Sequence, residues 1–152
     1  MRKIVLLLVI AVGMLWATAC GGSAPIATPT PSSVVMTASS NGTVVNVILA
    51  DNTVKSSLTA FQVGVPYTFV IQNSGRHAHN FNIAQPVSVA GSLDAALAKA
   101  LLAVDRNQLP VGATVTVEYT FPDSAVGQQL EFSCLIRKHY EDGMLLAITV
   151  TK

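Results

Sequence analysis

The chain has 152 residues, of which 51% are apolar and 11% are charged, and nine Lys and Arg residues stand against eight Asp and Glu. This length suits one domain with additional terminal segments, and the apolar content excludes an intrinsically disordered chain. The low and balanced charge lacks the basic excess of a nucleic-acid-binding protein.

Residues 1–19 have the three parts of a secretory signal peptide. Basic Arg2 and Lys3 precede an apolar run over residues 4–16, and small residues follow before Cys20. The run is shorter than the roughly 20 residues of a membrane-spanning helix, so we expect a cleaved signal and an exported protein. The small residues before Cys20 also resemble a bacterial lipobox, in which acylation of this cysteine attaches the protein to the membrane. The alternative is an ordinary signal-peptidase site that releases the protein.

Residues 20–33 are expected to form a tether. Gly, Ser, Thr, Ala and Pro predominate here, and Pro25, Pro29 and Pro31 prevent regular structure while they favour an extended chain. A lipid-attached Cys20 would then hold the folded part, residues 34–152, at the outer face of the cell membrane or in the periplasm.

Beyond the tether, short runs rich in Val, Ile, Thr, Phe and Tyr recur between turn residues. They cover residues 43–49, 54–59, 67–72, 115–121, 129–134 and 145–151. Several alternate apolar with polar residues, which is typical of a strand with one buried and one exposed face. The runs predict an all-β fold in which two antiparallel sheets pack as a sandwich.

One segment has a helical pattern instead. Ser92 can cap a helix, and Pro110 and Gly112 end the segment. Its apolar residues at helical spacing are Leu93, Leu97, Ala100, Leu101 and Val104. We predict one short helical flap that packs beside the sandwich through this stripe.

Metal-donor side chains gather in one loop near the C-terminus. Cys134, His139 and Met144 are separated by four residues each, which lets the chain turn back between donors. His79 follows a turn upstream, opens another short strand and offers a second imidazole. Two imidazoles, one thiolate and one weak thioether are the donor set of a blue-copper site, so the sequence predicts one bound copper ion.

The C-x4-H-x4-M loop and the upstream His-Asn-Phe motif resemble those of the cupredoxin family, which includes plastocyanins, azurins and auracyanins. The loop lengths are most similar to those of auracyanins. The resemblance covers residues 34–152 and implies a Greek-key β-sandwich with one type 1 copper ion. It also implies a role in shuttling single electrons between membrane-associated redox partner proteins.

The resemblance implies specific roles for individual residues. It assigns the copper to His79, Cys134, His139 and Met144. It implies that Asn80 braces the ligand loop and that the aromatic ring of Phe81 roots this turn in the core.

Each donor also has a simpler interpretation when it is taken alone. Cys134 can be a small buried apolar residue, Met144 can fill the core, and His79 can be a structural histidine. His77 is the alternative upstream ligand, because on a strand it would point to the same side as His79. We favour His79 because Asn80 follows it.

The ligand loop departs from the family pattern in its charge. Many relatives have Pro-Gly before the second histidine and apolar residues around it, whereas charged residues flank His139 on both sides here. The residues that we expect to dock a partner are Arg137, Lys138, Tyr140, Glu141 and Asp142. They would favour docking through charge pairs, and the alternative is that they only solvate the loop.

These features predict an electron carrier and not an enzyme, because four donors leave no open coordination position for a substrate. A copper oxidase or reductase would need a second copper and more than the three histidines present. One alternative is a copper-free β-sandwich lipoprotein that binds a partner, with Cys134 in its core. The other is a periplasmic copper-handling protein, for which methionine-rich segments would be expected.

Overall fold

The computed structural model of the protein describes residues 42–152. The predicted signal peptide, the lipidation site Cys20, the tether and the predicted domain start at residue 34 lie outside the described residues. Within residues 42–152, no helix has the length and apolar character needed to cross a membrane.

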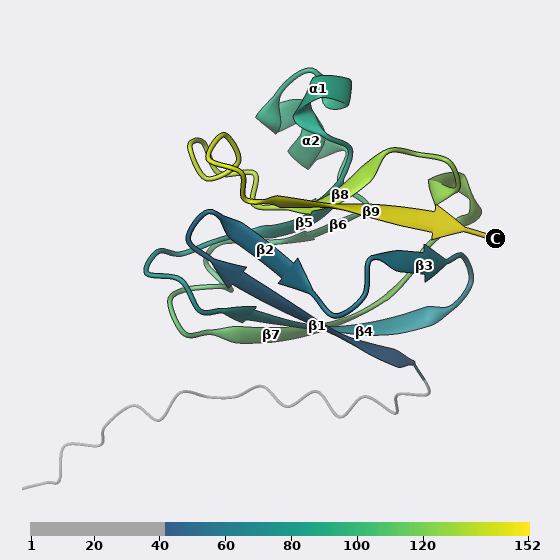
Figure 1. Ribbon diagram of the computed structural model, residues 1–152, viewed down its shortest axis with the longest axis horizontal. Coiled ribbons are helices and arrows are strands. Elements are labelled where there is room, and N and C mark those ends of the chain that lie inside the picture. The colour runs from purple at the N-terminus through teal and green to yellow at the C-terminus, as the bar shows by residue number, and fades with distance from the viewer. Residues whose placement is uncertain (1–41) are drawn as a thin grey trace, which may run out of the picture. The chain divides into compact units, whose positions relative to one another are not determined.

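The first sheet contains four strands in the order β2-β1-β4-β7 (Figure 1). They are β1 (Thr43–Ala50), β2 (Thr53–Ser56), β4 (Pro66–Asn73) and β7 (Thr114–Thr120). Alternate residues of β1, namely Val45, Val47 and Leu49, are fully buried, which is the two-residue period that the sequence pattern predicts. β1 runs parallel to β4, while β2 and β7 run antiparallel to their neighbours.

The second sheet contains five strands in the order β3-β9-β8-β5-β6. They are β3 (Ala60–Gln62), β5 (Phe81–Ala84), β6 (Leu102–Val104), β8 (Leu130–Ser133) and β9 (Leu145–Thr151). β3 runs parallel to β9, and the other pairs are antiparallel. The predicted all-β Greek-key sandwich is confirmed, but the expectation of purely antiparallel sheets is wrong. The chain crosses between the sheets before and after β3, and such crossovers bring parallel strands side by side.

The strand boundaries differ from the predicted ones where local hydrogen bonds intervene. β2 ends at Ser56 and not at residue 59, because the hydroxyl of Ser56 donates to the carbonyl of Leu58 at 2.7 Å and forms a turn. β3 and β6 are not among the predicted strands. Each has three residues, and so short a run shows no clear alternation.

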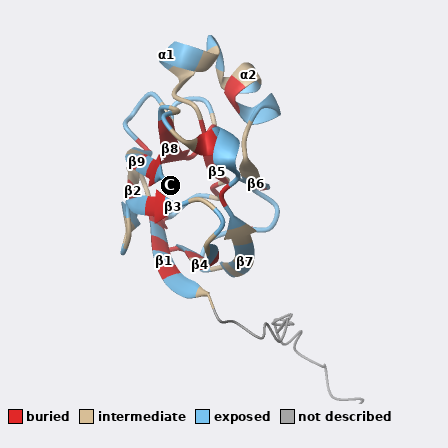
Figure 2. Cartoon of the chain, turned by 90° about the vertical axis from the view of Figure 1, so that its right-hand side faces the viewer, coloured by how far each residue is buried: buried red, intermediate tan, exposed pale blue. Residues whose placement is uncertain are grey.

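Phenylalanine side chains fill the space between the sheets. Phe61, Phe69, Phe81, Phe121 and Phe132 are each at most 1% exposed. Phe69 of β4 and Phe132 of β8 meet edge to face across the two sheets, with ring centroids 5.7 Å apart. Such a pair adds about 0.5–1.5 kcal/mol to the stability gained from burial. Figure 2 shows buried residues alternating with exposed ones along β1, whereas β5 and β8, the strands that border the site, are buried at every position.

The flap consists of two short helices, α1 (Val87–Ala90) and α2 (Leu93–Ala98), on the outer side of the five-stranded sheet (Figure 1). The hydroxyl oxygen of Ser92 accepts a hydrogen bond from the backbone N–H of Ala95 at 3.0 Å, so the predicted helix cap is confirmed. A small apolar cluster joins the flap to the sheet and to the loop after β8. Its buried members are Ala84, Ala96 and Leu135.

The helical part of the flap is shorter than the sequence predicts. α2 ends at Ala98, and Val104, which shares the predicted helical stripe, lies in β6 opposite Phe81. Leu97 is 41% exposed, so the prediction that it packs against the sandwich is wrong. The edge of β5 offers backbone hydrogen-bond partners to this segment, and pairing with that edge overrides the local helical pattern.

Candidate metal centre

The donor residues come from distant parts of the sequence and meet at one end of the second sheet. His79 lies just before β5, and Cys134 directly follows β8. β5 and β8 are antiparallel neighbours, with Asn82 opposite Ser133. The start of β5 and the end of β8 therefore lie at the same end of the sheet, and strand pairing brings the histidine to the cysteine.

The loop between β8 and β9 is closed by its own backbone. The N–H of Cys134 donates to the carbonyl of Met144 at 3.0 Å, and the N–H of Met144 donates to the carbonyl of His139 at 3.0 Å. Left-handed backbone at Lys138, with φ 70°, and at Gly143, with φ 95°, reverses the chain between these residues. The loop thereby returns Met144 to the side of Cys134.

Three donor atoms form a triangle of the size that a metal ion needs. The Sγ atom of Cys134 lies 3.8 Å from Nδ1 of His79 and 3.6 Å from Nδ1 of His139. The two Nδ1 atoms are 3.1 Å apart. The point in their plane that is equidistant from all three atoms lies about 2.0 Å from each, close to the roughly 2.0–2.3 Å of nitrogen and thiolate bonds to zinc.

The donors differ in their exposure to solvent. His79 is 1% exposed, Cys134 and Met144 are fully buried, and His139 is partly exposed. A metal ion bound to this group would thus be shielded by the protein on most sides, and His139 would be its contact with the surface.

Burial also controls the protonation of the donors. It lowers the pKa of His79, and the neighbouring His139 lowers that pKa further, which favours the neutral, metal-binding imidazole. Burial raises the pKa of the Cys134 thiol, while the backbone N–H groups of Asn80 and Ile136 oppose this effect. A metal ion that binds here displaces the thiol proton.

No model of a protein family matches this chain, and no curated protein matches it. Among solved structures, an auracyanin from the photosynthetic bacterium Roseiflexus castenholzii is similar with a TM-score of 0.54 and 20% identity, over 72% of this chain and 97% of that one. Auracyanin B gives a TM-score of 0.55 at 19% identity, over 72% and 89% of the two chains. Auracyanin A, a "blue" copper protein from Chloroflexus aurantiacus, gives 0.50 at 19% identity, over 72% and 99%. The chain has the cupredoxin fold.

The donor chemistry of the site fits one type 1 copper ion, as the sequence predicts. Two imidazole nitrogens and a thiolate in a trigonal group, with a weak thioether, are the donors of blue-copper sites. His79, Cys134 and His139 form such a group, and Met144 lies next to Cys134 in the closed loop. In the part of the chain that the structure describes, no second cluster of three His, Cys, Asp or Glu side chains could hold a metal ion.

Asn80 and Phe81 lie beside the donor residues and supply no atom to the donor triangle. The amide oxygen of Asn80 accepts a hydrogen bond from the backbone N–H of Leu135, the residue after Cys134, at 2.8 Å. Phe81 is fully buried, and its ring centroid lies 5.2 Å from that of Phe132. One side chain thus connects the two donor segments, and the other connects them to the core.

His77 lies outside the donor triangle. Its side chain is 66% exposed, and its Nδ1 atom lies 3.3 Å from Oδ1 of Asp51. The stretch from His77 to His79 precedes β5 and is not a strand, so the two-residue period that would align both rings does not apply.

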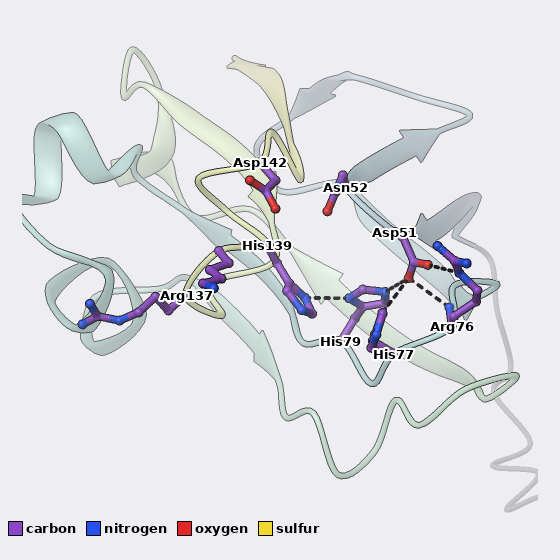
Figure 3. Close-up of a pocket in the computed structure, with 9 residues that line it drawn as sticks. Asp51, Asn52, Arg76, His77, His79, Arg137, His139 and Asp142 are labelled. Carbon is purple, nitrogen blue, oxygen red and sulfur yellow. Dashed lines mark hydrogen bonds and ion pairs between the residues drawn. The ribbon is translucent and has the colours of Figure 1, made fainter.

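Charged residues of the ligand loop stand on both sides of the partly exposed His139 in the sequence. Arg137, Lys138, Glu141 and Asp142 are all exposed. Figure 3 shows that the Arg137 side chain extends away from the imidazoles. Tyr140 is half-buried and differs from these residues, because its hydroxyl accepts a hydrogen bond from the backbone N–H of Val87 in α1 at 3.0 Å. Its ring packs under the flap and contributes to the loop's attachment.

A surface pocket beside the imidazoles contains residues that the sequence does not single out (Figure 3). Asp51, in the turn between β1 and β2, accepts hydrogen bonds from the backbone N–H and from Nε of Arg76, both at 2.9 Å. These bonds hold the pKa of Asp51 well below its usual range. Oδ1 of Asp51 also lies 3.6 Å from Nε2 of His79. In the sequence, Asp51-Asn52 indicates only a turn, and no pattern relates it to a histidine so far along the chain.

Proposed function

We propose that the protein is a type 1 blue-copper protein that transfers single electrons, with one copper ion held by His79, Cys134, His139 and Met144. The observation that carries this proposal is the donor triangle, whose size suits one metal ion. Bound copper supplies a one-electron Cu(II)/Cu(I) couple. Four donors leave no open position for a substrate, so the proposed role is that of a carrier and not an enzyme.

The role of the chain is to hold the donors in one arrangement for both charge states of the metal. The Cys134 to Met144 backbone bond and the Asn80 to Leu135 bond restrain the loop from two sides. A compromise geometry that suits Cu(II) and Cu(I) equally needs little rearrangement when the charge changes. Little rearrangement favours fast electron transfer.

We further propose that electrons leave through His139. It is the only partly exposed residue of the three-donor group, and four exposed charged side chains lie near it in the loop. Charges at this position would steer a redox partner protein with a complementary surface to the copper.

The proposed location is the outer face of the cell membrane. The secretory pattern of residues 1–19 and the lipobox-like Cys20 support export and acylation. A proline-containing tether would leave the copper domain free to reach membrane-associated redox partners.

The decisive experiment is an absorption and spin-resonance spectrum of the purified protein after addition of one equivalent of Cu(II). We expect an intense blue colour, because the charge-transfer band of a type 1 site comes from the copper–thiolate bond. Replacement Cys134→Ser should abolish the colour.

The chain offers a matched control for this experiment. Its only other cysteine is Cys20, so Cys20→Ser removes a cysteine sulfur outside the described residues and should leave the colour unchanged. A wild-type protein that stays colourless with Cu(II), or a blue Cys134→Ser variant, would contradict the proposal. Reversible voltammetry without consumption of oxygen or nitrite would support a carrier over an enzyme.

A further inference from the structure

We infer that Asp51 is a positioning residue of the copper site, whose carboxylate accepts the Nε2–H of His79 and thereby directs Nδ1 at the metal. The inference rests on the proposed function, because it takes His79 as a copper ligand. In Figure 3, Asp51 lies between Arg76 and the two histidines His77 and His79, and its carboxylate interacts with all three.

The orientation of the His79 ring directs one nitrogen toward the other donors and leaves the second nitrogen to form a hydrogen bond with the protein. Nδ1 faces Sγ of Cys134 and Nδ1 of His139. In a neutral imidazole that binds a metal through one nitrogen, the other nitrogen carries the proton. Nε2 of His79 is therefore a donor. It is buried and has no hydrogen-bond partner within residues 42–152.

The Asp51 carboxylate is the acceptor placed to meet this donor. Oδ1 lies 3.6 Å from Nε2, beyond the roughly 3.2 Å limit of a good N–H···O bond, so a small side-chain rotation would complete the contact. Histidines that bind metals almost always donate their second N–H to a carboxylate, a carbonyl or water, and this contact fixes the tautomer and the ring orientation.

Arg76 prevents the carboxylate from turning away. Its Nε atom donates to Oδ2 of Asp51 and its backbone N–H donates to Oδ1, each at 2.9 Å. Both oxygens are thus held while Oδ1 still faces His79. The loop between β4 and β5, which contains Arg76, therefore fixes the position of the Asp51 carboxylate through two hydrogen bonds.

Gly75 provides the space for this approach. A Cβ atom at this position would lie 2.6 Å from Nε2 of His79 and 2.7 Å from Oδ1 of Asp51. Any larger residue would therefore have to push the histidine and the carboxylate apart. Gly75→Ala is a steric test of the same contact, and it leaves both partners chemically intact.

A fixed negative charge beside Nε2 makes Nδ1 a stronger donor and stabilises Cu(II) more than Cu(I). In other metal sites, loss of a hydrogen bond to a metal-binding side chain lowers metal affinity about 10–100-fold. A tenfold loss of Cu(II) affinity with unchanged Cu(I) affinity raises the reduction potential by about 59 mV. Asp51→Asn and Gly75→Ala should both shift the potential upward.

The test uses the full chain and compares these two variants with wild type by voltammetry and by competitive Cu(II) and Cu(I) titration. We expect both to remain blue, to lose Cu(II) affinity at least tenfold and to raise the potential. Because Asp51→Asn and Gly75→Ala disturb the same contact, their effects should not add. The double variant should shift the reduction potential only slightly more than the single variant with the larger shift. In the metal-free protein, nitrogen NMR of the His79 ring should show the Nε2–H tautomer in wild type and a loss of it in Asp51→Ala.

Asp123→Asn is the matched control, because it removes an exposed carboxylate charge that lies outside the pocket. If Asp51→Asn shifts the potential no more than this control does, the role of Asp51 is refuted while the blue-copper proposal stands. If wild type binds no copper, the proposed function fails. The positioning role has a separate test in the metal-free protein, where it is refuted if nitrogen NMR shows the same Nε2–H tautomer of His79 with and without the Asp51 carboxylate.

Discussion

The amide oxygen of Asn80 accepts a hydrogen bond from the backbone N–H of Leu135 at 2.8 Å. This bond connects the residue after His79 to the residue after Cys134, so it ties together the two segments that supply the buried donors. The same oxygen accepts a hydrogen bond from Nδ2 of Asn82 at 3.1 Å, which orients the amide. The spacing of the donors therefore depends on a side chain that binds no metal.

Asn80→Ala should destabilise the metal-free protein by roughly 1–3 kcal/mol, because it leaves the N–H of Leu135 without its acceptor. Leu135 is only 6% exposed, so water cannot readily replace the lost partner. Urea unfolding measures the effect, and Asn107→Ala at an exposed position serves as control. Equal midpoints for the two variants would show that the bond does not hold the loop.

The arrangement of the donors is largely predictable from sequence, because three of them lie in one loop at spacings that allow the chain to reverse. The fourth, His79, precedes a short strand, and pairing of that strand with β8 brings it to Cys134. The types of the four residues are enough to predict the metal, since few ions use two imidazoles, a thiolate and a thioether together.

Other features depend on contacts between distant segments and cannot be read from local patterns. Tyr140 stands among charged residues, yet its hydroxyl meets Val87 of a helix that the sequence does not predict. Asp51 approaches His79 through a turn in the other sheet. The parallel pairing of β1 with β4 likewise follows from how the chain crosses between sheets, and strand periodicity carries no information on this.

Met144→Leu should preserve the blue colour and raise the reduction potential. The substitution keeps the volume of a fully buried side chain, so its cost in stability stays below about 1.5 kcal/mol. It removes a weak sulfur donor that supports Cu(II), and each tenfold loss of Cu(II) affinity raises the potential by about 59 mV. Voltammetry checks this. Ile148→Leu, a core change in β9, should leave the potential unchanged, and an unshifted Met144→Leu would argue against thioether ligation.

Glu131 should make the stability of the metal-free protein depend on pH. Its side chain is buried on β8, and its Oε1 atom has no hydrogen-bond partner among the described residues. Burial raises the pKa of Glu131 above 4.5, although the hydroxyls of Tyr140 and Ser133 oppose this effect. Between the unfolded and the folded pKa the native state binds more protons than the unfolded chain, so the free energy of unfolding falls as pH rises through this window.

Glu131→Gln should remove this pH dependence, because the amide cannot ionise. We expect the variant to unfold at higher urea concentration than wild type at neutral pH and to lose the advantage below the ordinary glutamate pKa of 4.5. Glu118→Gln, at an exposed position of β7, is the control. A wild-type stability that rises with pH across the same window would contradict the assignment.

Simultaneous replacement of Arg137 and Lys138 by Ala should change the electron-transfer rate without changing the blue spectrum. Both side chains are exposed and directly precede His139, so they alter the electrostatic potential that an approaching redox molecule meets. At low salt, oxidation by an anionic inorganic complex should slow about tenfold or more, and oxidation by a cationic complex should accelerate. The difference should fade at 0.1 M salt, where charges more than about 10 Å apart are screened.

Lys55→Ala on β2 removes an exposed charge outside the ligand loop and is the control. Electron-transfer rates that depend neither on the double replacement nor on the salt concentration would mean that these charges only solvate the loop.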